Sequence, residues 1–334
     1  MLVYLPFADS GRRCWRLVRH FRLLSYLPGT FECGDSVPPA RARVAITNPL
    51  MVSHGTDQIQ RQGENLMDIV DAQIHATHRG IDQSIAIMDA VGVNAAIIDI
   101  WPPERTQLPN GVYRFEYKFG EEAVARFPAR FAYVARFDPN DPDIDDLMAQ
   151  VRKSPGRLCV RLASGHDLKI LHEGGHERIL AAAGKHGVPI MIYPGGDHPA
   201  LTNYVRKFDS VQFIIDHVGM GVDRAALPGQ LETTIDNLLA YSKYPNVAVK
   251  WGHAPRLSRE PFPYRDLITQ LRRVIDAFGV KRLMWASDFT VTVDHHTYAE
   301  SLFCLRCAEL LSENEKEWIL GKTAREVLSW PRPA

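Results

Sequence analysis

The side chains with the clearest chemical potential lie in residues 69–75, which read Ile-Val-Asp-Ala-Gln-Ile-His. Alternate residues of a strand point to the same face, so Asp71, Gln73 and His75 are expected to lie together. With histidine at position 73 the pattern would be Asp-x-His-x-His, in which two imidazoles can hold one metal ion. An amide is a poor zinc ligand beside imidazole, so Gln73 brings this metal site into question.

Further polar residues follow the apolar runs of the chain, at the points where strands are expected to end. In a parallel barrel the carboxyl ends of the strands meet at one mouth, where reacting groups gather. Taken singly, each residue has an ordinary explanation, such as a buried histidine or a helix cap. Their coincidence at most strand ends favours a functional site. The candidates are Arg161, Tyr193, Asp216, His217, Lys250, His253 and Asp288.

Three acidic residues and two histidines near these positions are interpreted differently. Asp82, Asp99 and Glu104 are assigned to surface or loop-capping positions, and His295 and His296 to the solvated rim of the mouth.

The elements that must position these residues alternate regularly from Met67 onward. Apolar runs of strand length occur at 69–74, 93–100, 131–136, 157–163, 188–193, 211–216, 246–250 and 282–287. Helical periods lie between them at about 81–91, 119–127, 142–152, 175–186, 198–208, 229–242, 264–278 and 296–311. Eight alternations predict a (β/α)8 TIM barrel. An open doubly wound sheet is the alternative, but the glycine-rich first turn typical of it is missing here.

The first 66 residues differ from the rest of the chain, because they contain eight arginines and no lysine. A targeting presequence, a membrane-surface helix and upstream sequence translated from an early start codon are the three interpretations. The last is favoured, since Met67 directly precedes the first strand. We therefore predict a poorly ordered extension at 1–66 that carries no chemistry, and a barrel domain at 67–330.

Composition excludes several classes of protein. Of 334 residues 46% are hydrophobic, and 39 basic residues balance 39 acidic ones, so no basic field predicts a nucleic-acid partner. Five cysteines without a disulfide framework indicate a reducing compartment, and we expect a cytoplasmic protein. No apolar run approaches the length of a membrane span, so no membrane partner is expected.

Four motifs together resemble the amidohydrolase superfamily, specifically its amidohydrolase-related, lactonase-like branch. They are Asp71–His75, Ile215–Gly219, Asn246–Lys250 and Trp285–Asp288. Over residues 67–330 the resemblance implies a TIM barrel with hydrolytic chemistry at its mouth. It also implies that a complete metal site would use both strand-one histidines, a strand-four lysine or glutamate, histidines on strands five and six, and the strand-eight aspartate.

Against that pattern the chain keeps His75, His217 and Asp288 but departs from it at three positions. Gln73 replaces a strand-one histidine, Tyr193 stands near the strand-five histidine, and Arg161 brings a cation to strand four. We therefore expect no metal cofactor. If a divalent metal such as zinc does bind, the expected ligands are His75, His217 and Asp288.

The resembling branch includes members that hydrolyse lactones without metal, which is chemically reasonable because a lactone is an activated ester. Asp288 is expected to activate water, with His217 and His75 donating to the developing oxyanion. The substrate is expected to be a lactone or similar cyclic ester of a small carboxylic acid. The alternatives are a metal-dependent decarboxylase of an aromatic or enoic acid and a catalytically silent barrel that binds a small acid. Substrate binding is assigned to Gln73, Arg161, Tyr193 and Lys250.

Barrels of the kind that this chain resembles often pair, so the resemblance implies a homo-oligomer. No residue pattern indicates which surface would form the interface.

Overall fold

A computed structural model of the chain describes residues 67–163, 168–223 and 225–332. The extension predicted at residues 1–66 lies outside this part of the chain. None of the helices within the described ranges combines the length and the apolar character that crossing a bilayer demands.

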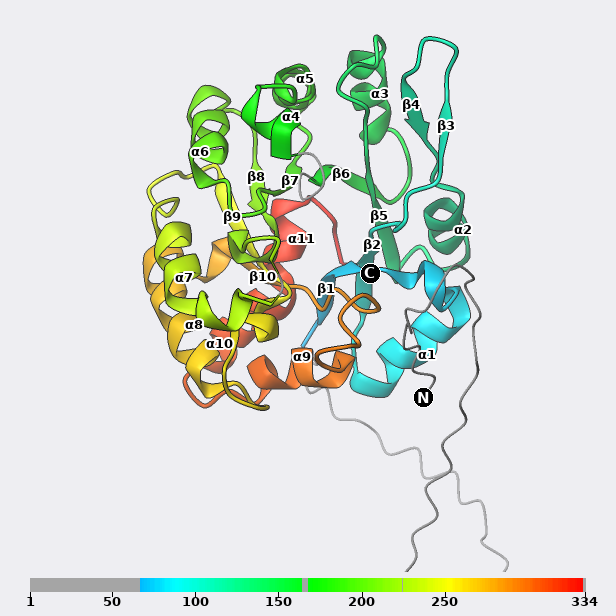
Figure 1. The fold of residues 1–334 in the computed structure, drawn as a ribbon. Coiled ribbons are helices and arrows are strands. Elements are labelled where there is room, and N and C mark those ends of the chain that lie inside the picture. Colours follow the sequence, from blue (N-terminus) through cyan, green and yellow to red (C-terminus); the bar gives the residue numbers. More distant parts are fainter. Residues whose placement is uncertain (1–66, 164–167, 224, 333–334) are drawn as a thin grey trace, which may run out of the picture. The chain divides into compact units, whose positions relative to one another are not determined.

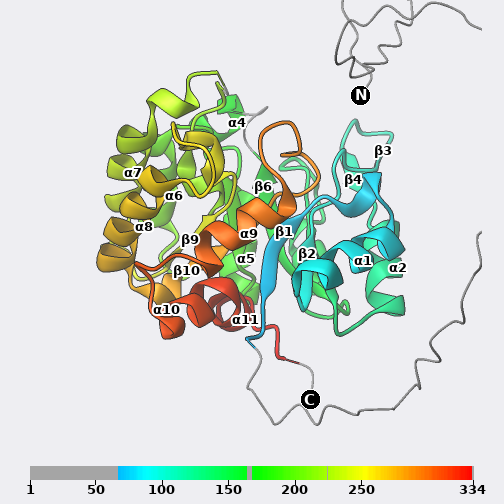
Figure 2. The same cartoon turned by 90° about the horizontal axis from the view of Figure 1, so that it is seen from below.

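Eight parallel strands of the described residues form one sheet in chain order, with helices around them (Figures 1 and 2). The predicted (β/α)8 TIM barrel is confirmed, and each strand lies within or beside a predicted apolar run. The strands are β1 (Val70–Ile74), β2 (Ala95–Ile98), β5 (Phe131–Ala135), β6 (Arg157–Ala163), β7 (Ile190–Tyr193), β8 (Phe213–Ile215), β9 (Val247–Trp251) and β10 (Leu283–Trp285).

Helices lie between consecutive strands of the barrel and after the last strand, β10, as the helical periods predicted. They are α1 (Ile81–Val91), α2 (Lys118–Arg126), α3 (Ile144–Val151), α4 (Leu168–His172), α5 (Glu177–His186), α6 (His198–Lys207), α7 (Leu231–Leu239), α8 (Arg265–Phe278), α9 (Tyr298–Arg306), α10 (Glu313–Glu317) and α11 (Thr323–Val327).

The loop after β2 contains an antiparallel hairpin that the sequence pattern did not predict. Its strands are β3 (Arg105–Gln107) and β4 (Tyr113–Phe115). The residues of β3 are exposed and those of β4 half-buried, so neither strand shows the apolar alternation that marks a strand in the sequence.

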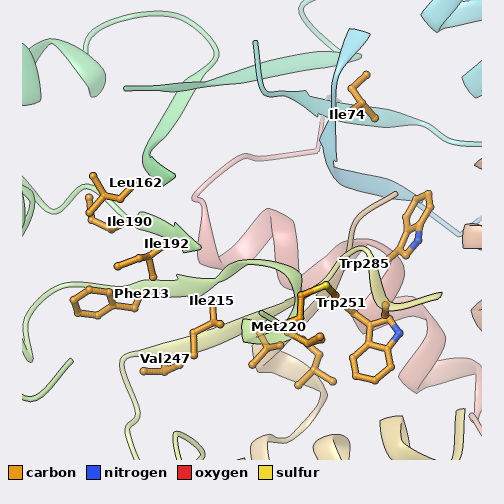
Figure 3. Packing of buried hydrophobic residues seen from close by; sticks show 14 of the residues in the cluster. Ile74, Leu162, Ile190, Ile192, Phe213, Ile215, Met220, Val247, Trp251 and Trp285 are labelled. Carbon is orange, nitrogen blue, oxygen red and sulfur yellow. The ribbon is translucent and has the colours of Figure 1, made fainter. Parts of the chain in front are cut away.

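Successive residues of each strand pack in two different layers. An outer layer of larger side chains packs between the strands and the helices, and Figure 3 shows part of it around Ile192, Phe213, Ile215 and Val247. An inner layer of mostly smaller side chains fills the barrel itself, as the period of two residues along a strand requires. The inner layer includes Val70, Ala72, Ala95, Ile97, Ala132, Val134, Cys159, Met191, Ile214, Ala248, Met284 and Ala286.

The pairing of β1 with β2 is irregular between Asp71 and Ile74. Such a shift breaks the strict alternation of side chains. The expectation that Asp71 shares a face with Gln73 is therefore wrong: Asp71 contacts Ser287, whereas Gln73 contacts Lys250 inside the barrel.

The first and last strands meet along a seam that Asp71 holds together. Its carboxylate accepts hydrogen bonds from the backbone N–H of Ser287 at 2.9 Å and from the Ser287 hydroxyl at 2.5 Å. Beside it, the Asp288 N–H donates to the Gln73 carbonyl at 3.0 Å, and the His75 N–H donates to the Phe289 carbonyl. These contacts close the barrel and bring strand-one side chains next to Asp288.

Asp71 makes the stability of the protein depend on pH in a defined window. Burial raises the pKa of its carboxyl to about 7, and hydrogen bonds from Ser287 only partly oppose this. The folded protein therefore keeps a proton that the unfolded chain loses near pH 4, and the free energy of unfolding contributed by Asp71 falls as pH rises from about 4 to about 7. We expect Asp71→Asn to remove this decline, which amounts to a few kcal/mol.

Urea unfolding of both proteins at several pH values between 5 and 8 measures the effect. Other groups titrate in both proteins, so the difference between the two unfolding free energies isolates Asp71. A difference that does not change with pH would contradict the prediction.

Candidate active site

Five polar residues predicted at strand ends point into the barrel because of the strand alternation. Each stands two residues beyond a member of the inner layer, which places it on the same face one step nearer the mouth. All except the half-buried Tyr193 are buried. The five are Arg161, Tyr193, Asp216, Lys250 and Asp288.

The buried side chains of Arg161, Asp216 and Lys250 form a closed ring with Asp99 and the amide of Gln73 across the mouth end of the barrel. Arg161 donates through Nε to Asp216 Oδ2 at 2.5 Å and through Nη1 to Asp99 Oδ2 at 2.6 Å. Lys250 Nζ lies 2.6 Å from Asp216 Oδ1 and donates to Gln73 Oε1 at 2.6 Å. Gln73 Nε2 completes the ring by donating to Asp99 Oδ2 at 3.5 Å.

The charges of this ring are strongly coupled. Burial alone would raise the pKa of Asp99, but Arg136 and Arg161 outweigh it and lower that pKa to about 2. Likewise, Lys250 and Arg161 overcome burial and hold the pKa of Asp216 well below its usual range. Both carboxylates are therefore ionised at neutral pH and neutralise the cations around them.

A second group lies beside the ring and consists of His217, His253 and Asp288. Each of the three offers one ligand atom, and these atoms lie within 4.8 Å of one another. The two rings stack with centroids 4.3 Å apart, and His217 Nδ1 lies 3.3 Å from Asp288 Oδ2. No hydrogen-bond partner within the described residues satisfies His217 Nδ1, His253 Nε2 or either carboxylate oxygen of Asp288, although all four atoms are buried.

The protonation states of this cluster suit a cation. Burial would raise the pKa of Asp288, but the neighbouring His217 outweighs it and holds the pKa well below its usual range, so the carboxylate is ionised. Burial also holds the pKa of His253 well below its usual range, so that ring is neutral and has a free lone pair. Two imidazoles and a carboxylate form a ligand set that zinc and related divalent metals accept.

The backbone at the cluster adopts conformations that side chains disfavour. His217, His253 and Asp288 have φ values of 52°, 55° and 55°, in the left-handed region that residues other than glycine rarely enter. Between them, Gly252 permits a close approach, since a Cβ atom there would lie 2.6 Å from Asp288 Oδ2. Strain of this kind is retained where a site needs it.

The remaining predicted histidine, His75, has a different environment. Its Nδ1 lies 3.0 Å from the backbone oxygen of Asp99, while Gln73 Nε2 lies 3.2 Å from its Nε2. The ring therefore donates at Nδ1 and accepts at Nε2. Its Nε2 is 3.7 Å from Asp288 Oδ1, so it borders the cluster without belonging to the group of ligand atoms.

Arg161 also reaches this cluster, because its Nη2 lies 3.2 Å from His217 Nε2. A guanidinium can only donate, so Nε2 accepts and the proton of a neutral His217 ring stands on Nδ1. A cation at Nδ1 needs the opposite arrangement. Metal binding and the Arg161 contact therefore compete at His217.

Tyr193, assigned to substrate binding, lies at the edge of the cluster. Its ring meets the His217 ring edge-on at a centroid distance of 4.9 Å, and its hydroxyl donates to the Gly221 carbonyl at 3.1 Å.

Sequence reasoning missed two members of the site and misjudged a neighbour. Asp99, interpreted as a surface or loop group, has no exposed surface and accepts from both Arg136 and Arg161. Arg136 was not singled out, although it directly follows β5 in the position that a strand-end search inspects. His296 is buried, not solvated.

Comparisons with known proteins agree with this architecture. A family model described as amidohydrolase matches residues 36–330, and thus begins before the predicted domain start at 67. No curated protein matches the chain.

Several solved structures share the fold at low sequence identity. An amidohydrolase from Burkholderia multivorans with bound zinc is 19% identical, with a TM-score of 0.64 over 79% of this chain and 100% of that one. A probable 2-pyrone-4,6-dicarboxylic acid hydrolase from Acinetobacter baumannii with citric acid bound is 17% identical, with a TM-score of 0.59 and the same coverage. A 5-carboxyvanillate decarboxylase from Novosphingobium aromaticivorans, complexed with manganese and a nitrobenzoic acid, is 17% identical, with a TM-score of 0.53 over 74% and 79%.

The expectation that no metal takes part is wrong. It rested on the departures at Gln73, Arg161 and Tyr193, and it overlooked that His253, in the loop after β9, supplies a second imidazole beside His217 and Asp288. Structures of similar fold also hold zinc or manganese. The family model matches more than half of the residues of this chain, and the chain therefore belongs to the amidohydrolase family of enzymes.

Proposed function

We propose that this protein is a metal-dependent hydrolase that opens a lactone or similar cyclic ester of a small carboxylic acid. The observation that carries the proposal is the cluster of His217, His253 and Asp288, whose buried ligand atoms lack partners within the described residues and whose backbone is strained at all three positions.

The residues present fit a divalent cation. The two imidazoles and the carboxylate would hold it, leaving at least one position open, as catalytic metal sites do. Such an ion, when bound, lowers the pKa of water and polarises an ester carbonyl.

The chain's own residues supply the remaining steps. Asp288 is ionised, and one of its oxygens faces His217 while the other faces His75, so the carboxylate can take a proton from an attacking water. His75 is fixed by the Asp99 carbonyl and the Gln73 amide, and therefore orients this carboxylate and is not free to turn. Arg161, engaged by Asp99, Asp216 and His217, is assigned to positioning in place of the predicted anchoring of a substrate carboxylate.

Charge balance supports an anionic substrate. Three buried carboxylates offset three buried cations, so the network alone has no excess charge. A divalent cation would leave it positive, and the ionisation of Asp71, whose pKa is about 7, would remove only one of the two added charges. Such an excess attracts a carboxylate and stabilises the oxyanion of ester cleavage. The balanced groups are Asp99, Asp216 and Asp288 with Arg136, Arg161 and Lys250.

The descriptions of similar structures are compatible with this choice, since one is a 2-pyrone-4,6-dicarboxylic acid hydrolase with citric acid bound. Another is a decarboxylase complexed with manganese. Decarboxylation on the same barrel is therefore the competing outcome that the experiment must separate.

The test begins with metal removal from the purified protein by a chelator, followed by reconstitution with zinc or manganese. Both preparations are assayed on a panel of carboxylated lactones, by acid release, and on a panel of aromatic carboxylic acids, by carbon dioxide release. We expect metal-dependent acid release from at least one lactone. Carbon dioxide release without lactone cleavage would overturn the proposal in favour of decarboxylation, and equal lactone turnover without metal would overturn its metal dependence.

A further inference from the structure

The ammonium group of Lys250 lies inside the barrel with no exposed surface. It is surrounded by three acceptors: Gln73 Oε1 at 2.6 Å, Asp216 Oδ1 at 2.6 Å and the sulfur of Met191 at 3.1 Å. Gln73 and Met191 accept hydrogen bonds from the ammonium, and the Asp216 carboxylate forms an ion pair with it. Lys250 is therefore a positive charge held inside the barrel by three neighbours.

The amide of Gln73 spans the space between Lys250 and His75. Its oxygen accepts from Lys250, while its NH2 group lies 3.2 Å from His75 Nε2. That contact uses the lone pair which His75 would otherwise offer to an ion shared with position 73. Beside β1, the NH2 group of Gln73 therefore covers His75 Nε2, and the Lys250 ammonium lies on the other side of the Gln73 amide. Both groups exclude a metal ion from this part of the site.

We propose that the buried ammonium of Lys250 takes the place of a second metal ion, so that the barrel binds a single divalent cation. Like charges repel strongly where water is excluded, and Lys250 and Arg161 already occupy both oxygens of Asp216. The inference rests on the proposed function in one respect, the presence of an ion at His217, His253 and Asp288.

Counting zinc tests this inference without an activity assay. The full-length protein is stripped with a chelator, equilibrated with buffered zinc, dialysed and analysed by mass spectrometry for zinc per chain. Three proteins are compared: wild type, Gln73→His and the double variant Gln73→His/Lys250→Met. Thermal unfolding of each metal-free protein shows whether it is folded.

We expect one zinc in the wild type and one in Gln73→His, because the ammonium still repels a second ion. In the double variant we expect two, since the introduced imidazole, His75 and the released oxygen of Asp216 form a two-histidine-one-carboxylate site. Methionine is chosen because it fills the volume of the lysine stem without its charge.

Each other result has a defined meaning. Two zinc ions in the wild type would overturn the inference and leave the proposed function intact. Two in Gln73→His alone, or one in a folded double variant, would show that Lys250 is not what excludes the second ion. No zinc in the wild type would overturn the metal requirement of the proposed function and the inference with it. If the double variant does not fold, the counts of the other two proteins decide.

Discussion

Replacing Asp288 by asparagine is expected to lower kcat on any substrate of the reconstituted enzyme by about 10²–10⁴-fold, the usual contribution of a positioned general base. The substitution preserves shape and removes only the charge. Asp288 is ionised, has no exposed surface and lies between His217 and His75. Because the same carboxylate belongs to the ligand cluster, zinc should also bind more weakly.

Steady-state kinetics and competition with a zinc-binding dye measure the two effects. Asp276→Asn is the matched control, since this aspartate lies on α8 with 65% of its side chain exposed. It should leave both values within a factor of two. Unchanged turnover in Asp288→Asn, with circular dichroism like that of the wild type, would show that another group accepts the proton.

Replacing Arg161 by methionine is expected to lower the free energy of unfolding by about 3–5 kcal/mol, the usual cost of removing one partner from a buried ion pair. Without the guanidinium, Asp99 is paired with one cation fewer. Asp216 and His217 also lose their contacts with Arg161. Both aspartates have no exposed surface, so water cannot replace the guanidinium without rearrangement.

Urea unfolding of the metal-free protein measures this cost. Arg273→Met is the matched control, because Arg273 Nη2 lies 2.6 Å from Asp236 Oδ1 while their side chains are 44% and 61% exposed. An exposed pair of this kind contributes about 1 kcal/mol or less. Equal losses in the two variants would mean that Arg161 does not hold the ring together.

Much of the barrel could be predicted because its strands are buried on both sides and are therefore mostly apolar along their length. The hairpin β3–β4 could not, since its residues are exposed or half-buried and carry no apolar alternation. The irregular register of β1 also escaped prediction, because nothing in its sequence marks the point where the alternation breaks.

The residues of the candidate site could be predicted from their positions at strand ends, but the contacts between them could not. Asp288, His217 and Lys250 were identified from their positions alone. That His253 and not His75 joins His217 and Asp288 depends on the left-handed backbone of three residues and on the absence of a side chain at Gly252. The expectation of a metal-free site failed for this reason, since counting retained ligands ignores one that a different loop supplies.

The seam between β1 and β10 also determines when the protein can become active during its synthesis. Asp71 and Ser287 are separated by 216 residues, so the contact forms only after Ser287 and the whole segment before it have left the ribosome. His75 is made early and meets Asp288 only when this late contact is in place. Nascent chains are therefore unable to assemble the complete site, and the partly built barrel must keep its strand edges apart until the last strand arrives.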